Sequence, residues 1–116
     1  MSIEKRQHSR LIVNWPVVVN IPQGSLKGQV KDISVGGVCI FCPEEPVTDE
    51  NFSILLNPSE QRSIAVIGEK VWSDKSETGC GTVFGMGIRF IYISQGDHQD
   101  IAELVKNEQL DLSFGA

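Results

Sequence analysis

Short β-forming runs separated by turn residues cover most of this sequence, and they limit the folds that it can adopt. Six runs are rich in β-branched and aromatic residues. They span residues 11–20, 26–33, 36–42, 52–56, 63–72 and 82–91. Because closing a sheet removes its exposed edges, this pattern predicts an all-β fold, a six-stranded antiparallel β-barrel. Pro16 cannot donate a hydrogen bond to a ladder, so we expect the first run to be an edge strand or to contain a bulge.

One amphipathic helix is expected after the last strand, over residues 94–110. Its apolar positions have the i, i+3, i+4 spacing of one helical face and are Ile101, Leu104 and Val105. Ser94 or Asp97 is expected to cap its N-terminus. The apolar stripe is narrow, which favours a helix that lies over one mouth of the barrel. The predicted organisation is a flexible N-terminal arm (1–10), the barrel (11–93), the helix (94–110) and a tail (111–116).

The cysteines and histidines do not predict a metal site. Cys39 and Cys42 form a C-x-x-C, but on a strand a spacing of three places their side chains on opposite faces. The histidines are few, His8 and His98. The N-terminal MSIEKRQHSR is polar, and no run approaches the roughly 18 to 20 apolar residues of a membrane helix. We therefore expect a cytoplasmic protein with reduced thiols and without membrane insertion.

The residues that catalysis requires are also missing from the pattern, so we expect no enzyme and no catalytic residue. Ser34 in DISVGG lacks the glycine two positions earlier that a nucleophile elbow has. His8 beside Ser9 is typical of a solvated loop. Gly85 and Gly87 alternate with apolar residues in FGMGIRF, so they lie on one strand face and leave room for a group packed against it.

The net charge of −5 disfavours binding to a nucleic-acid polymer, which needs a basic face. The charge is unevenly distributed, however. Residues 1–10 carry three basic side chains and one acidic side chain, whereas residues 97–111 carry five acids and one lysine. A small anion is therefore expected at the N-terminal end.

Two arginines in RQHSR are the first candidate ligand contacts. Arg6 and Arg10 are four residues apart, which places both guanidinium groups on the same side of a helical turn or an extended segment. Such a pair can hold a phosphate and stack on a base. The same spacing is also typical of a solvated basic arm.

The turn segment KDISVGG supplies a complement, with Asp32, Ser34, Gly36 and Gly37. A carboxylate accepts hydrogen bonds from the N–H edge of guanine, a hydroxyl bonds to phosphate or base, and glycine lets the backbone approach a flat ligand. The alternative is a local Asx or Ser/Thr turn with glycines at positive φ.

Taken in order, R-x-x-x-R at Arg6 and Arg10 and D-x-S-x-x-G at Asp32, Ser34 and Gly37 resemble the two-part signature of PilZ domains, receptors for cyclic di-GMP. The strand that ends in VW at residues 71–72, then GMGIRF at 85–90 and a C-terminal helix, follow the order of this family.

The resemblance implies a barrel whose N-terminal arm folds across the outside and traps the dinucleotide. Arg6 and Arg10 would hold phosphates and stack on guanine, Asp32 and Ser34 would meet a guanine edge and a phosphate, and Gly37, beside Gly36, would shape the turn. Lys5 would influence whether one ligand or a stacked pair binds.

Arg89 is a further candidate, either a third cation at the site or a surface arginine paired with acids. The expected ligand is cyclic di-GMP, with no cofactor and with an unidentified protein partner. The alternative is a PilZ-like adaptor that acts without nucleotide.

Overall fold

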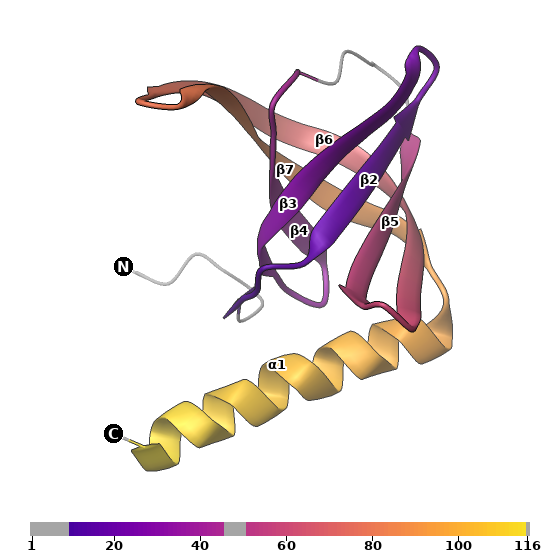
Figure 1. The fold of residues 1–116 in the computed structure, drawn as a ribbon. Helices are drawn as coiled ribbons and strands as arrows, with labels where there is room; N and C mark the ends of the chain where they lie inside the picture. Colours follow the sequence, from indigo (N-terminus) through magenta and orange to yellow (C-terminus); the bar gives the residue numbers. More distant parts are fainter. Residues whose placement is uncertain (1–9, 46–50, 116) are drawn as a thin grey trace, which may run out of the picture.

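The computed structural model describes residues 10–45 and 51–115, with side-chain surroundings given through Lys106. The described chain forms strands followed by one helix (Figure 1). The elements are β1 (Leu11–Ile12), β2 (Pro16–Ile21), β3 (Gly24–Ile33), β4 (Gly37–Cys42), β5 (Phe52–Ser59), β6 (Arg62–Thr78), β7 (Gly81–Ile93) and α1 (Gln95–Gly115).

The strands close into the predicted six-stranded antiparallel barrel. The order around the barrel is β3, β2, β5, β6, β7 and β4, and β4 pairs with β3 to close it. The short β1 also pairs with β3, at its C-terminal end, through Leu11 opposite Ile33 and Ile12 opposite Asp32. Closure leaves β3 with β1 and β2 on one side and β4 on the other, so Asp32 and Ile33 at its C-terminal end lie between β1 and β4.

The first predicted strand is divided, and its longer part, β2, is not an edge strand. Residues 13–15 separate β1 from β2, and Pro16 is the first residue of β2, opposite Gln29. β2 then pairs with β5 as well as β3, so the predicted edge position is wrong. The first position of a strand tolerates the missing N–H, which explains how the proline is accommodated inside the barrel.

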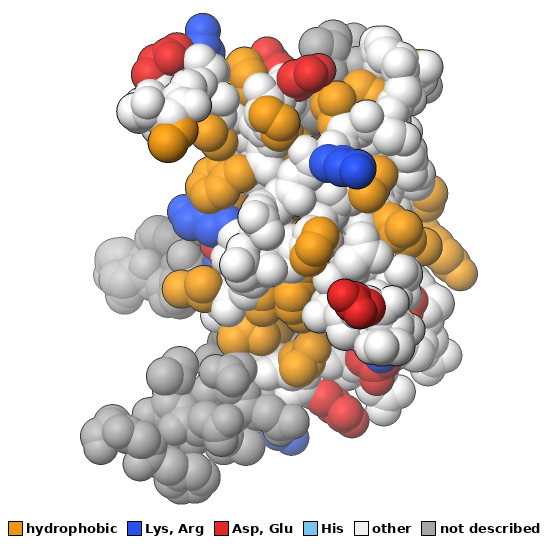
Figure 2. All heavy atoms as spheres, in the orientation of Figure 1, with side chains coloured by type: hydrophobic (Ala, Val, Ile, Leu, Met, Phe, Trp, Pro, Cys, Tyr) orange, Lys and Arg blue, Asp and Glu red, His pale blue; other side chains and the backbone are white. Residues whose placement is uncertain are grey.

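Inward-facing residues of the strands fill one hydrophobic core. In β5, for example, Phe52, Ile54 and Leu56 are buried at alternate positions, as the period of two requires. Hydrophobic side chains also reach the surface, and Figure 2 shows several of them on one face with basic side chains beside them. Exposed hydrophobic residues of β6 include Val71 and Trp72, which are 54% and 47% exposed.

The hairpin of β6 and β7 is longer than the runs 63–72 and 82–91 indicated. It extends to Thr78 and Gly81 and projects away from the barrel at the upper left of Figure 1. The sequence DKSETG between these runs is polar and turn-like, so it does not show a strand period. Pairing between the two long strands overrides that local preference, and Gly81 at φ 124° closes the turn.

The C-terminal helix lies across one open end of the barrel, as predicted (Figure 1). Ser94 caps it, because its Oγ accepts a hydrogen bond from the Asp97 amide at 3.2 Å. The helix continues to Gly115, beyond the predicted end at residue 110. No glycine or proline stands between Gly96 and Gly115, so the sequence contains no residue that would break it earlier.

Only part of the predicted apolar stripe of α1 enters the core. Ile101 and Val105 are 0% and 6% exposed, whereas Leu104 is 40% exposed. Arg62 at the start of β6 anchors the first turns by ion pairs with Asp97 at 3.0 Å and with Asp100. These contacts raise the pKa of the Arg62 guanidinium, so it stays protonated. In the described part of the chain, no helix has the length and apolarity needed to cross a membrane.

We expect Ile101→Ala to lower the free energy of unfolding by about 2–4 kcal/mol, because it leaves a cavity between helix and barrel. Leu104→Ala is the matched control, three residues away on the same helix, and should cost below about 1 kcal/mol. Urea denaturation followed by circular dichroism measures both. Equal losses would mean that Ile101 is not the residue that docks the helix.

Candidate ligand-binding site

The turn between β3 and β4 is held by its own serine. The Ser34 backbone amide donates to the Gly37 carbonyl at 2.8 Å, and the Ser34 Oγ accepts from the Gly36 amide at 3.2 Å. Ser34 is 6% exposed, so its hydroxyl is largely committed to the turn. The neighbouring strand β7 also binds the turn, because the Phe90 amide donates to the Gly36 carbonyl at 2.9 Å. The turn is therefore fixed against β7 as well as within itself.

The alternative of a local Asx or Ser/Thr turn placed the glycines at positive φ, and the structure does not bear this out for Gly36 and Gly37. In the described residues only Gly24 and Gly81 have positive φ, so Gly36 and Gly37 do not use the left-handed region. A Cβ on Gly37 would instead collide with the backbone carbonyl of Ile88. Gly37 is thus required because β4 approaches β7 closely at this point.

Arg10 joins the N-terminal arm to the turn segment. Its Nη1 lies 2.5 Å from Oδ1 of Asp32, and the two side chains are 36% and 15% exposed. Asp32 stands opposite Ile12 on one side and Cys39 on the other, so β1 and β4 fix its position. Residues that are 22 positions apart in sequence therefore meet in one ion pair.

Trp72 lies against the two glycines of FGMGIRF. A Cβ on Gly87 would collide with the Trp72 indole, and a Cβ on Gly85 would lie 3.7 Å from Cζ3 of the same ring. The prediction that these glycines leave room for a packed group is confirmed. In the sequence, Trp72 is recognised only as part of the VW pair in the family resemblance, and its place in the site is missed. Its pairing with Gly87 across β6 and β7 gives it a place in the site.

A cavity of about 460 Å³ opens between these elements. Its walls combine cationic, hydroxyl, aromatic and backbone surface. The lining residues are Arg10, Ser34, Gly36, Gly37, Val38, Cys39, Val71, Trp72, Gly87, Ile88, Arg89 and Phe90. Asp32 is not one of these lining residues, but it forms the ion pair with Arg10, which is. Such a surface offers donors for an anion, an acceptor for N–H groups and a flat ring for stacking.

Cys39 and Cys42 lie on opposite faces of β4, as the strand spacing predicted. Cys42 belongs to the hydrophobic core and Cys39 lies on the floor of the cavity. Burial raises the pKa of Cys42 to about 11. Burial is also the main cause that raises the pKa of Cys39, and the Asp32 carboxylate adds to it. Both thiols therefore stay protonated at neutral pH and are poor nucleophiles.

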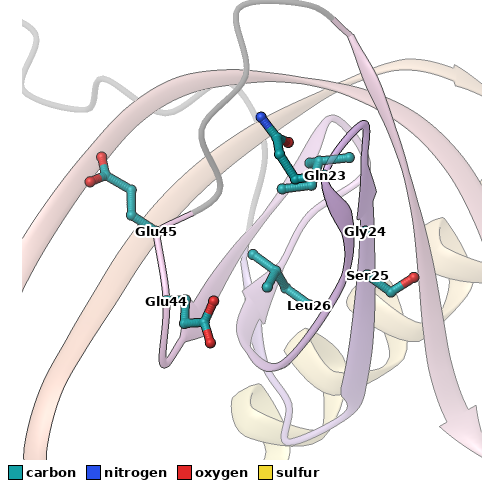
Figure 3. A pocket seen from close by; sticks show the side chains of 7 residues that line it. Gln23, Gly24, Ser25, Leu26, Glu44 and Glu45 are labelled. Atoms are coloured by element: carbon teal, nitrogen blue, oxygen red, sulfur yellow. The ribbon is translucent and has the colours of Figure 1, made fainter.

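A second cavity of similar size, about 460 Å³, lies near the turn between β2 and β3 (Figure 3). Glu44 and Glu45, which follow β4, contribute carboxylates to it, and Leu26 lines it from β3. No lysine or arginine is among its lining residues. Volume does not distinguish the two cavities, but charge does, because an anionic ligand is repelled from the second.

The remaining predicted site residues differ in how they are placed. Arg89 lines the first cavity, but its guanidinium also binds Glu69 through Nε at 3.1 Å and through Nη2. Arg89 is thus a cation at the cavity and also a surface arginine paired with an acid, the two possibilities that the sequence left open. Arg6 and Lys5 lie outside the described residues.

A family model described as the PilZ domain matches residues 4–107. An uncharacterized protein of Aquifex aeolicus (strain VF5) is 30% identical over 110 residues, which are 95% of this chain and 52% of that protein. The chain thus spans about half the length of this relative.

Solved structures share the fold at low sequence identity. The inhibitor of motility MotI/DgrA of Bacillus subtilis has a TM-score of 0.75 at 19% identity, over 94% of this chain and 53% of that one. The PilZ domain of YcgR from Escherichia coli, solved with c-di-GMP, has 0.72 at 13% identity, over 94% and 95%. MrkH of K. pneumonia in complex with c-di-GMP has 0.79 at 14% identity, over 98% and 57%.

The family match extends over nearly the whole chain and includes both arginines of R-x-x-x-R and the full D-x-S-x-x-G turn, so the protein belongs to the PilZ domain family.

Proposed function

We propose that this protein is a receptor for cyclic di-GMP. One observation carries the proposal: the Arg10–Asp32 ion pair joins the two halves of the signature at the rim of a cavity of about 460 Å³. A ligand that occupies this cavity meets a cation and an aromatic ring together, with the Asp32 carboxylate beside the cation. YcgR and MrkH, which share the fold, were solved with c-di-GMP bound.

Each half of the site has a chemical counterpart in the dinucleotide. Arg10, together with Arg6, binds phosphate oxygens and stacks on a guanine, because a guanidinium combines a donor fork with a flat face. Asp32 bonds Arg10 through Oδ1, and its second oxygen accepts from the N–H edge of guanine. Ser34, Gly36 and Gly37 hold the turn in a shape that presents Asp32.

Trp72 supplies a platform for a base. Its ring lies flat on Gly87, so one face is covered by backbone, yet the side chain remains 47% exposed. An exposed ring face beside a cavity is suited to stacking with a purine, which is worth about 1–3 kcal/mol per base in nucleic-acid binding proteins. The pairing of a ring with cations favours a purine nucleotide over a simple anion.

The protein acts by binding rather than by catalysis. We place it in the cytoplasm, where binding of the dinucleotide changes its conformation and alters its contact with a protein partner. Arg89 belongs to the surface ion pair with Glu69 and adds little to affinity. The alternative is an adaptor that uses the same barrel without nucleotide, and calorimetric titration with cyclic di-GMP distinguishes the two: an adaptor gives no binding heat.

Arg10→Ala is expected to weaken cyclic di-GMP binding by about tenfold to a few hundredfold, since it removes a charge-assisted hydrogen bond of about 1.5–3 kcal/mol. Arg6→Ala should do the same. Arg89→Ala is the control from the same cavity, and its affinity should stay within about threefold of wild type. Isothermal titration calorimetry measures all three.

The stability of the free protein should change little in these variants. Arg10 is partly exposed and makes one surface ion pair, so Arg10→Ala should cost no more than about 1 kcal/mol. With ligand at about ten times the wild-type Kd, thermal melts should show a clear rise in the midpoint of wild type and a rise at most about a third as large in Arg10→Ala. If Arg10→Ala kept the full ligand-induced gain, the site would be misplaced.

Selectivity should follow from the two halves of the ligand. GMP, GTP and cyclic AMP satisfy only part of the contacts, so we expect each to bind at least about tenfold more weakly than cyclic di-GMP. Competition against a fluorescent cyclic di-GMP in an equilibrium assay gives the ratios. Equal competition by GTP or cyclic AMP would contradict the proposed assignment of Asp32 to guanine.

A further inference from the structure

A β-bulge in β3 places the side chains of Lys31 and Asp32 on the same face, which the strand pattern does not. Val30 stands opposite Ile40 and Asp32 opposite Cys39, so Lys31 is the extra residue between two successive pairs. In a regular strand, Lys31 and Asp32 would point to opposite faces. Here Val30 and Ile33 are buried, Lys31 is exposed and Asp32 reaches outward to Arg10. The bulge therefore brings two adjacent charged side chains to the outer face, beside the cavity.

The ammonium group of Lys31 rests over an aromatic ring. Its Nζ lies 5.7 Å from the ring centroid of Phe41, on the neighbouring strand β4. Phe41 and Trp72 approach the same point of β7, because a Cβ on Gly85 would lie 3.4 Å from the first ring and 3.7 Å from the second. Phe41 thus lies next to Trp72, outside the lining of the cavity itself, and holds a cation at that border of the site.

Lys31 differs from the other cations near the cavity in its charge balance. Arg10 is paired with Asp32 and Arg89 with Glu69, whereas Lys31 has no ion pair with any residue of the described chain. The charges of Lys31, Asp32 and Arg10 all act on the Cys39 thiol at the cavity floor. Lys31 is therefore a cation near Cys39 at the floor of the cavity, and no carboxylate of the described residues neutralises it.

We propose that Lys31 contacts the ligand, its ammonium binding a phosphate oxygen of the dinucleotide on the side of the site that faces Phe41. Phe41 is a positioning residue that holds the ammonium at this border. The proposal rests on the proposed function. The ammonium keeps its contact with the Phe41 ring while an N–H group donates to the phosphate oxygen, so the ring holds the cation in place for the ligand.

The test compares Lys31→Ala with Lys27→Ala by isothermal titration calorimetry with cyclic di-GMP. Lys27 is the matched control, because it is an exposed lysine on the same strand and also lacks an ion pair with the described residues, but it has no ring contact of this kind. Lys31→Ala should weaken binding by about five- to twentyfold. Lys27→Ala should stay within about twofold of wild type, and Lys31→Arg should recover most of the lost affinity.

A double-mutant cycle tests the part assigned to Phe41. Phe41→Leu should weaken binding by about two- to fourfold in wild type, because the ammonium is no longer held at the border. In the Lys31→Ala background it should have no further effect, since there is no ammonium to position. A similar loss in both backgrounds would contradict the positioning role.

The outcomes separate this proposal from the receptor function. If Lys31→Ala binds as Lys27→Ala does while Arg10→Ala is impaired, the receptor function stands and the Lys31 contact is wrong. If wild type gives no binding heat, the receptor function fails, and the Lys31 contact fails with it. An affinity loss in Lys31→Ala that comes with a lower melting midpoint of the free protein indicates a folding defect and also overturns the contact.

Discussion

The pairing of β4 with both β3 and β7 is the constraint on which the candidate site depends. It closes the barrel, and it brings the turn after β3 alongside β7, where the two are joined by a backbone hydrogen bond. The pairing is tight enough that Gly37 cannot carry a side chain, because the Ile88 carbonyl occupies that space. Without this closure, the segment that carries Asp32 and Ser34 would not lie near Trp72 of β6.

Charge decides what the closed barrel can bind. Two cavities have about the same volume, but one is lined by Glu44 and Glu45 and the other by two arginines. In the cavity lined by arginines, Arg10 lies at the rim, and its ion pair with Asp32 balances its charge. A site of this kind combines anion attraction with hydrogen-bond direction, which a bare basic patch does not. The acidic character of the whole chain is thus compatible with an anionic ligand at one place.

Strand pattern and motif spacing predicted much of the fold and the signature residues, because the core positions and the D-x-S-x-x-G turn are local in sequence. The errors arose where tertiary pairing overrides local preference. Polar residues 73–78 lie in β6 because β7 pairs with them, and Pro16 lies at the start of a strand paired on both sides. The glycines of the turn looked like residues for positive φ, but Gly37 is needed for a close approach between strands.

The sequence by itself determined the barrel, the helix over its mouth and the residues of both signature halves, since alternation of apolar side chains and turn residues act over short distances. Only the tertiary structure decided that Arg10 meets Asp32, that Trp72 covers Gly87 and that Lys31 faces outward beside its neighbour. The first two contacts join residues 22 and 15 positions apart, and the third depends on a bulge in strand register. Pairing between strands sets such positions, and no pattern within one strand records them.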